Sequence, residues 1–330
     1  MPFSISLADI QAAAGRIQDH AVQTPVMTSA VLDVAVGARV FLKPENLQRT
    51  GSFKFRGALN RLLQLSAEER RAGVVAWSSG NHAQGIAAAA QILGIPATIV
   101  MPKDAPAVKV EKTRGYGAEV IGYDRYTESR EEIGHRLSKE RGWVLVPSYD
   151  DSHIIAGQGT AGLELVKQMT ARGEALDVLL VCCGGGGLIA GMSTAFKALS
   201  PKTEVYSVEP AEFNDHERSL QSGQREANDP GARSFCDALL APTPGSLTFD
   251  INQHTLVGGL SVTDAQVKEA MRFAFDSLKL VVEPGGAVAL AAALSSKLDL
   301  ARRSVGVVLS GGNVDPGLIA EVVSAQGRPL

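Results

Sequence analysis

The sequence predicts an α/β protein of two domains, each an open, mostly parallel sheet flanked by helices. Short apolar stretches alternate with segments of helical periodicity in two series along the chain. Strands that alternate with helices of ten or more residues favour parallel sheets covered on both faces, because each right-handed crossover returns the chain in the same direction. The expected strands are residues 39–43, 74–77, 97–101, 119–123, 143–146, 178–183, 204–208 and 305–309.

The two series of strands suggest where the domains divide. At 330 residues the chain fits one large or two medium domains. We expect a small domain at residues 50–147 and a large domain made of residues 1–49 and 148–330. No linker rich in Pro, Gly or Ser separates them, so we expect the two domains to share a tight cleft.

Composition and charge narrow the class of partner. Apolar residues make up 45% of the chain and charged residues 20%, which is typical of a globular protein. The net charge of −3 argues against a nucleic-acid partner, since such proteins usually carry a cationic patch. No run of 18 apolar residues predicts a membrane span, and the first residues do not resemble a signal peptide. The charge balance thus favours a small molecule as the partner. Cys182 and Cys183 are adjacent in an apolar strand and cannot easily form a disulfide bond, so we predict a reducing compartment and a cytoplasmic protein.

Lys54 is the first candidate for chemistry. It lies in Gly-Ser-Phe-Lys-Phe-Arg-Gly, between a polar loop and a predicted helix at residues 57–65. Burial between aromatic side chains would lower the pKa of its amine towards the range where it condenses with a carbonyl group. A surface lysine on an amphipathic segment is the alternative.

A run of four glycines, Gly184 to Gly187, is the second candidate. It follows an apolar strand and precedes a helical segment that begins near Leu188. Bare backbone amides at a helix N-terminus bind phosphate, assisted by the helix dipole. A flexible turn and a dinucleotide-binding loop are the alternatives, but the Gly-x-Gly-x-x-Gly pattern with its acidic partner is only loosely met.

A polar loop at residues 78–82 is the third candidate. Ser78, Ser79, Gly80, Asn81 and His82 stand between a strand and an alanine-rich helix. Their hydroxyl and amide groups can hold a carboxylate, and Asn81 can place its amide beside a phenolic oxygen. His82 is either a titrating group or a structural residue of the first helical turn.

Two further positions end apolar segments. Ser310, in Ser-Gly-Gly-Asn, follows a strand and so stands where ligands of open α/β folds bind. Glu283, in Glu-Pro-Gly-Gly, opens an alanine-rich helix, and a plain helix cap is as good an interpretation as a ligand contact.

The motifs Ser-Phe-Lys-Phe-Arg-Gly, Ser-Ser-Gly-Asn-His, Gly-Gly-Gly-Gly and Ser-Gly-Gly-Asn-Val occur in this order. In order and spacing they resemble the fold type II pyridoxal-phosphate enzymes, specifically the threonine and serine dehydratases with serine racemase. The resemblance covers most of the chain. It implies a tryptophan-synthase-β-like fold, pyridoxal 5'-phosphate as cofactor and a homodimer.

The resemblance also implies roles for individual residues. Lys54 would bond covalently to the cofactor, Asn81 would lie at the ring hydroxyl and Ser310 at the pyridine nitrogen. The implied cofactor contacts are Phe53, Lys54, Asn81, Gly184, Gly185, Gly186, Gly187, Leu188, Glu283 and Ser310. The implied substrate contacts are Ser78, Ser79, Gly80, Asn81, His82 and Arg130. Ser79 is the candidate for proton transfer on the face opposite Lys54.

The implied activity is removal of water and ammonia from a β-hydroxy amino acid such as threonine or serine. Racemisation and the dehydration of hydroxyaspartate, an aryl-serine or a hydroxyectoine derivative on the same cofactor are alternatives. Glu283-Pro-Gly-Gly and Cys236-Asp-Ala-Leu depart from the family pattern, so the substrate stays open. A non-enzymatic amino-acid sensor is the alternative from another class, and Lys54 argues against it.

An acidic loop suggests a metal site. Glu209 and Asp215 are six residues apart in a loop that follows a strand, and oxygen ligands suit Mg²⁺ or Ca²⁺. The racemase branch has a divalent site at this turn, which implies Glu209, the Phe213 carbonyl and Asp215 as ligands here. A solvated acidic loop is the alternative.

Overall fold

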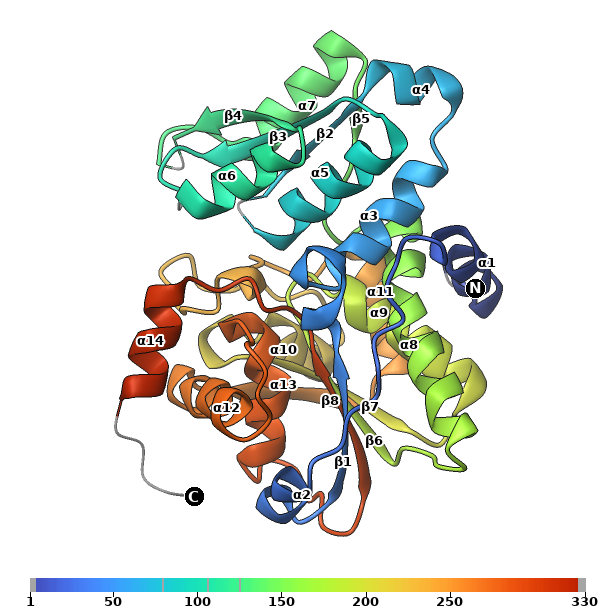
Figure 1. The fold of residues 1–330 in the computed structure, drawn as a ribbon, viewed down its shortest axis with the longest axis vertical. Helices are drawn as coiled ribbons and strands as arrows, with labels where there is room; N and C mark the ends of the chain where they lie inside the picture. The colour runs from blue at the N-terminus through green and yellow to red at the C-terminus, as the bar shows by residue number, and fades with distance from the viewer. Residues whose placement is uncertain (1–3, 79, 106, 125, 326–330) are drawn as a thin grey trace.

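Two parallel sheets organise the protein in the computed structural model (Figure 1). The structure describes residues 4–78, 80–105, 107–124 and 126–325. Within these residues the larger sheet has five strands in the order β1-β9-β6-β7-β8, and the smaller has four in the order β4-β3-β2-β5. Every pairing in both sheets is parallel. The predicted α/β class with two open parallel sheets is therefore confirmed.

The larger sheet forms from apolar segments that are mostly buried. Its strands are β1 (Arg39–Pro44), β6 (Val178–Cys182), β7 (Glu204–Pro210), β8 (Gly258–Val262) and β9 (Ser304–Leu309). Val305 in β9 pairs with both Val40 and Val178. This strand has a neighbour at each edge and is mostly buried, which fits its continuous apolar sequence.

Strand β8 was not expected from the sequence. Gly258 and Gly259 open it, and glycine weakens the apolar pattern that predicts a strand. A Cβ atom on Gly259 would lie 2.7 Å from the Cα atom of Glu217. The glycine therefore permits the close approach of the neighbouring helix, which the sequence pattern does not reveal.

The smaller sheet contains β2 (Val74–Trp77), β3 (Ala97–Pro102), β4 (Glu119–Tyr123) and β5 (Val144–Leu145). The strand expected at residues 143–146 is thus only two residues long. All four strands lie inside the segment that we expect to form the small domain. The domain boundaries themselves stay a prediction.

Helices cover the faces of both sheets. They are α1 (Leu7–Ile17), α2 (Ala30–Val36), α3 (Lys54–Leu63), α4 (Ala67–Ala72), α5 (Asn81–Leu93), α6 (Ala107–Gly115), α7 (Arg130–Arg141), α8 (Ser152–Ala171), α9 (Gly187–Leu199), α10 (Asp215–Ser222), α11 (Ser246–Thr255), α12 (Asp264–Asp276), α13 (Pro284–Leu294) and α14 (Pro316–Ser324). Short 3₁₀ turns are Glu45–Leu47, Arg49–Gly51, Ala211–Phe213 and Asp237–Leu239. Among the described residues, no helix has the length and apolar character needed to cross a membrane.

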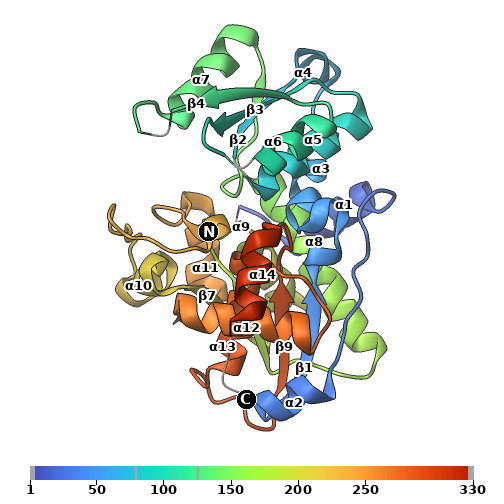
Figure 2. The ribbon, with the colours of Figure 1, turned by 60° about the vertical axis from the view of Figure 1, so that its left-hand side comes forward.

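Helix α3 lies between the two sheets and packs against both α5 and α8 (Figure 1). Helix α12 packs against α13 and α14. The turned view shows these helices in orange and red (Figure 2). Helices α8 and α9 approach closely because Gly159 faces Gly191, whose carbonyl oxygen would be 2.8 Å from a Cβ on Gly159. Lys54, at the start of α3, is therefore placed where the two sheets meet.

Candidate active site

Lys54 occupies the loop-to-helix junction that the sequence predicts. It is the first residue of α3, directly after Phe53. Its Nζ donates a 2.7 Å hydrogen bond to the Ser148 carbonyl and lies 5.2 Å from the centre of the Phe53 ring. Burial lowers the pKa of this amine to about 8, although the Cys182 and Glu283 groups oppose the shift. A minor fraction of the Lys54 amine is therefore an uncharged nucleophile near neutral pH.

A buried ion cluster holds the first turn of α3. The Arg56 guanidinium is fully buried and donates to Glu45 Oε2 at 2.7 Å and to Glu164 Oε1 at 2.6 Å. Lys43 Nζ donates to Glu164 Oε2 at 2.8 Å. Arg56 is two residues from Lys54, so the cluster fixes the helix that carries the amine. The sequence analysis gave Arg56 no role, since its partners are distant in the chain.

Asn81 and Glu283 join the two sheets across the site. The Asn81 side-chain amide donates to Glu283 Oε1 at 2.5 Å, and Asn313 Nδ2 donates to Asn81 Oδ1 at 2.8 Å. Glu283 precedes α13, but its side chain makes no capping hydrogen bond there. Glu283 is thus the N-cap residue of α13 through its backbone, while its side chain binds Asn81 instead. Burial, with Asp237 nearby, raises the pKa of Glu283 to about 8.

His82 is a neutral, buried residue in the first turn of α5. Its Nε2 lies 3.0 Å from the Val146 carbonyl, to which the ring donates when Nε2 carries the proton. Burial and the Lys54 charge lower the pKa of His82 to about 3. In the preceding loop, Ser78 Oγ accepts from the Gly80 amide at 3.1 Å. Ser79, which we expect to contact the substrate and to transfer a proton, lies outside the described residues.

The glycine run forms a crowded cradle between β6 and α9. Gly186 has a φ of +93°, and a Cβ on it would lie 2.6 Å from His216 Nε2. A Cβ on Gly185 would collide with the Tyr149 ring, and one on Gly187 would lie 2.7 Å from Gln158 Oε1. Only glycine fits these positions, so the amides stay accessible at the start of α9.

Unsatisfied polar atoms at this cradle fit an anionic cofactor. Neither side-chain polar atom of Gln158 has a hydrogen-bond partner, and the Ser52 hydroxyl, buried two residues before Lys54, has none either. Buried polar atoms are nearly always paired in proteins, so these unpaired atoms are suited to hydrogen bond with a bound group. Together with the bare amides at the α9 N-terminus, Gln158 suits a phosphate group.

Ser310 lies at the carboxyl end of β9, beside Cys182 at the end of β6. The Ser310 carbonyl accepts a 3.1 Å hydrogen bond from the Phe53 amide. Burial raises the pKa of Cys182 to about 12, so the thiol is neutral. The group offered at this position is therefore an uncharged hydroxyl. The sequence analysis did not place Cys182 near Lys54, because only the sheet order brings the two together.

Arg130 is the first residue of α7, and its side chain is exposed. Its Nε donates to Glu131 Oε1 at 2.8 Å. Burial and the Asp150 charge raise the pKa of Tyr149, and the Arg130 charge opposes this rise. The Tyr149 ring covers Gly185, so the Arg130 charge acts on a residue that lines the glycine cradle. The sequence analysis missed Tyr149, which no motif marks.

The acidic loop is buried rather than solvated. Glu209 is inaccessible, and its two oxygens accept from the His216 and Glu217 amides at 3.0 and 2.8 Å. Asp215 Oδ1 accepts from Asn228 Nδ2 at 2.6 Å, whereas Asp215 Oδ2 has no partner. Burial, followed by the Asp215 charge, raises the pKa of Glu209 well above its usual range, and burial raises that of Asp215 to about 6. The solvated-loop alternative is therefore wrong for these carboxylates.

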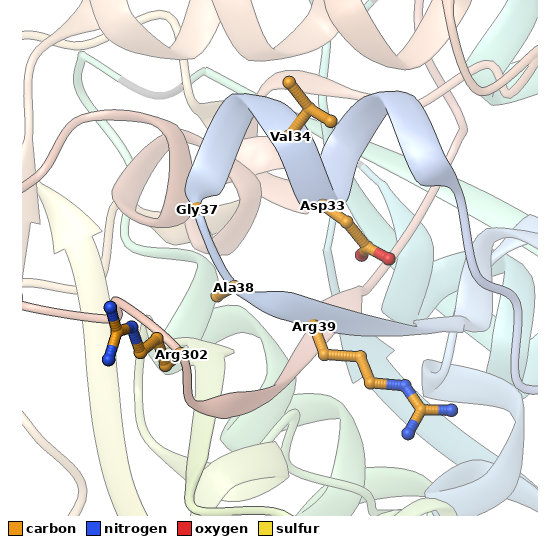
Figure 3. Close-up of a pocket in the computed structure, with 6 residues that line it drawn as sticks. All are labelled: Asp33, Val34, Gly37, Ala38, Arg39 and Arg302. Atoms are coloured by element: carbon orange, nitrogen blue, oxygen red, sulfur yellow. The ribbon is translucent and has the colours of Figure 1, made fainter.

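A shallow pocket lies at the other end of the large sheet (Figure 3). Its lining residues are Asp33, Val34, Gly37, Ala38, Arg39 and Arg302. Arg39 is the first residue of β1, so the pocket stands at the amino ends of the strands. Lys54 and Ser310 gather at the carboxyl ends, which is where open α/β folds bind ligands.

Comparisons with known proteins agree with this geometry. The family model described as "Pyridoxal-phosphate dependent enzyme" matches residues 17–311. An L-threo-3-hydroxyaspartate ammonia-lyase of Pseudomonas sp is 49% identical over 94% of this chain and 96% of its own. A serine racemase of Schizosaccharomyces pombe is 44% identical over 93% of this chain and 94% of its own. The crystal structure of a threonine deaminase from T.th. has a TM-score of 0.89 at 45% identity, covering 94% of this chain and 99% of that one.

Proposed function

Because the chain belongs to the family of pyridoxal-phosphate dependent enzymes, we propose that it is an ammonia-lyase that acts on a β-hydroxy amino acid. Its substrate of choice is L-threo-3-hydroxyaspartate. The relative with that activity supports this proposal, and so does the place of Arg130. Hydroxyaspartate has a second carboxylate, for which the Arg130 guanidinium is a suitable partner.

The described residues fit the cofactor. Gly184 to Gly187 would hold its phosphate, Asn81 would lie at its ring hydroxyl and Ser310 at its ring nitrogen. When bound, pyridoxal phosphate supplies an electron sink that makes the α-hydrogen of an amino acid acidic. A neutral hydroxyl at Ser310, unlike a carboxylate, does not hold the ring nitrogen protonated, which favours prompt elimination.

Lys54 is the group that moves the proton. Its lowered pKa leaves part of the amine unprotonated near neutral pH, so that Nζ can accept the α-hydrogen as a proton. Its hydrogen bond to the Ser148 carbonyl fixes the position of Nζ. Loss of the β-hydroxyl then leaves an enamine product, which hydrolyses to a 2-oxo acid and ammonia.

A substrate panel tests this proposal. We would measure ammonia and 2-oxo acid release from L-threo-3-hydroxyaspartate, L-threonine and L-serine. We expect hydroxyaspartate to give the highest kcat/KM, and Arg130→Met to lower that value at least tenfold while changing the value for serine little. Arg136→Met, an exposed arginine on the same helix, is the matched control. Equal loss for all substrates would remove Arg130 as the selector, and no ammonia from any of them would refute the lyase.

Racemisation is the second candidate, since a serine racemase is 44% identical to this chain. It needs a proton donor on the face opposite Lys54, which is the role proposed for Ser79. Chiral analysis of the unreacted substrate separates the two activities. Formation of the D-isomer without ammonia would favour the racemase.

We also propose a divalent cation, Mg²⁺ or Ca²⁺, bound by Glu209, the Phe213 carbonyl and Asp215. Two buried carboxylates and the unpartnered Asp215 Oδ2 support it, because buried charges are usually paired or bind metals. Mg²⁺ or Ca²⁺ should raise the melting temperature of chelated wild-type protein by mass action. The response should disappear in Asp215→Ala, and its absence in the wild type would exclude the site.

The homodimer and the cytoplasmic location are further proposals. The family resemblance supports the homodimer, and mass measurement in solution tests it. Three buried free thiols, Cys182, Cys183 and Cys236, support a reducing compartment.

A further inference from the structure

Three side chains next to the phosphate cradle form a cluster of a different kind from the acidic loop. Cys183 follows β6, Glu209 lies in β7 and His216 lies in the first turn of α10. All three are buried, and their ligating atoms lie within 4.8 Å of one another. This set therefore brings a sulfur, an oxygen and a nitrogen atom close together.

The partners of His216 show which ring nitrogen is available. His216 Nε2 lies 3.1 Å from Asn252 Nδ2, while His216 Nδ1 and Asn252 Oδ1 both lack a partner. When the Asn252 amide group is rotated by 180°, His216 Nε2–H donates to Asn252 Oδ1. The lone pair of Nδ1 is then free. Histidines that bind metals almost always donate their other ring N–H in this way.

The distance between His216 Nδ1 and Glu209 suits a shared ion better than a direct bond. Nδ1 lies 3.7 Å from Glu209 Oε1 and 3.8 Å from Asp215 Oδ2. Both exceed the hydrogen-bonding range. Metal–ligand bonds of about 2.0–2.3 Å in tetrahedral geometry separate neighbouring ligand atoms by about 3.3–3.7 Å. The backbone amides occupy one lone pair on each Glu209 oxygen and leave another for an ion.

We propose that Cys183, Glu209 and His216 bind a divalent transition ion of the zinc or cobalt class. A thiolate and an imidazole favour such ions over Mg²⁺ and Ca²⁺, which prefer oxygen. This inference goes beyond the proposed cation site, with which it shares only Glu209, so one ion binds at a time. It does not depend on the lyase activity.

The ion would act on the cradle through His216. His216 Nε2 is so close to Gly186 that a Cβ there would lie 2.6 Å away. Fixing Nδ1 on a metal holds the imidazole against the turn that precedes α9. Ion binding would thereby order the phosphate cradle, which is a stabilising and not a chemical role.

Cobalt(II) is the probe for the test. Chelator-treated holoenzyme is titrated with Co²⁺, and the d–d bands are recorded at wavelengths beyond the absorption of the cofactor. We expect one equivalent per chain with the intense bands of a four-coordinate site that contains sulfur. Mg²⁺ in large excess should not abolish them.

Variants assign the ligands. Cys183→Ser and His216→Gln should each lose the intense bands, whereas Cys236→Ser, which changes another buried thiol, should keep them. Asn252→Leu removes only the partner of Nε2 and should weaken Co²⁺ binding about 10–100-fold. Circular dichroism and cofactor absorbance check that each variant is folded.

The wild-type spectrum decides the question even where a variant fails to fold. Weak bands of a six-coordinate oxygen site would overturn the proposal. Bands that survive in Cys183→Ser and His216→Gln but vanish in Asp215→Asn would also overturn it, and would leave the Mg²⁺ or Ca²⁺ site in place. In neither case does the result bear on ammonia release.

Discussion

Asn81 donates its side-chain amide to the Glu283 carboxyl group at 2.5 Å, across 202 positions of sequence. Asn81 begins the helix after β2 of the small sheet, and Glu283 precedes a helix that covers the large sheet. One hydrogen bond therefore ties both sheets at the predicted cofactor ring. Because Glu283 is buried, its protonation state bears on the stability of the fold.

We expect Glu283→Gln to change how stability depends on pH. The pKa of Glu283 is about 8 in the folded protein, and its ordinary value is 4.5. As the pH rises, this carboxyl group therefore ionises in the unfolded chain before it ionises in the folded protein. The wild type thus loses about 1.4 kcal/mol per pH unit from this group as the pH rises between these two values. Cofactor-free Glu283→Gln should lack this loss.

Denaturant titrations between pH 5 and 9 measure the difference. Glu204→Gln is a control, since that carboxylate pairs with Arg303 at a partly exposed position. Parallel stability curves for the wild type and Glu283→Gln would contradict a raised pKa.

We expect Lys54→Ala to abolish both turnover and the visible absorption of the bound cofactor while the fold stays intact. Nζ makes only one hydrogen bond among the described residues, to the Ser148 carbonyl, so its loss costs little stability. Absorbance, ammonia release and circular dichroism measure the three effects. Lys197→Ala, an exposed lysine of α9, should behave as the wild type. Ammonia release near the wild-type rate would show that another group moves the proton.

We expect Ser310→Asp to impair elimination at least tenfold. A carboxylate at this buried position would favour a protonated ring nitrogen and so change how the reaction partitions. It would also stand beside the buried Cys182 thiol. Steady-state ammonia release and the cofactor spectrum are the measurements, with Ser310→Ala as the milder variant. An unchanged rate with an unchanged spectrum would remove Ser310 from the ring.

The sequence predicted those features that depend on local pattern. Apolar strands followed by glycine or serine identified the ends of β6 and β9, and the aromatic neighbours of Lys54 identified the helix junction. These signals work because parallel strands place their carboxyl ends together. The family resemblance then supplied the cofactor.

Features that depend on tertiary packing could not be predicted in this way. Tyr149 covers Gly185 only because β5 ends beside the cradle, and His216 contacts Gly186 only because α10 follows the neighbouring strand. The solvated acidic loop was a wrong alternative because burial of Glu209 is decided by packing around β7. No spacing rule in one sequence encodes such contacts.

The ion cluster around Arg56 leads to the last prediction. Arg56→Met leaves the Glu45 carboxylate buried without its guanidinium, and removing one partner of a buried ion pair costs about 3–5 kcal/mol. Lys268→Ala, which breaks an exposed pair with Glu321, should cost about 0–1 kcal/mol. Unfolding in urea measures both. Adding Glu45→Gln to Arg56→Met should restore part of the stability, because it removes the uncompensated charge. A loss below about 1 kcal/mol in Arg56→Met, the range of an exposed pair, would mean that the cluster does not hold the helix of Lys54.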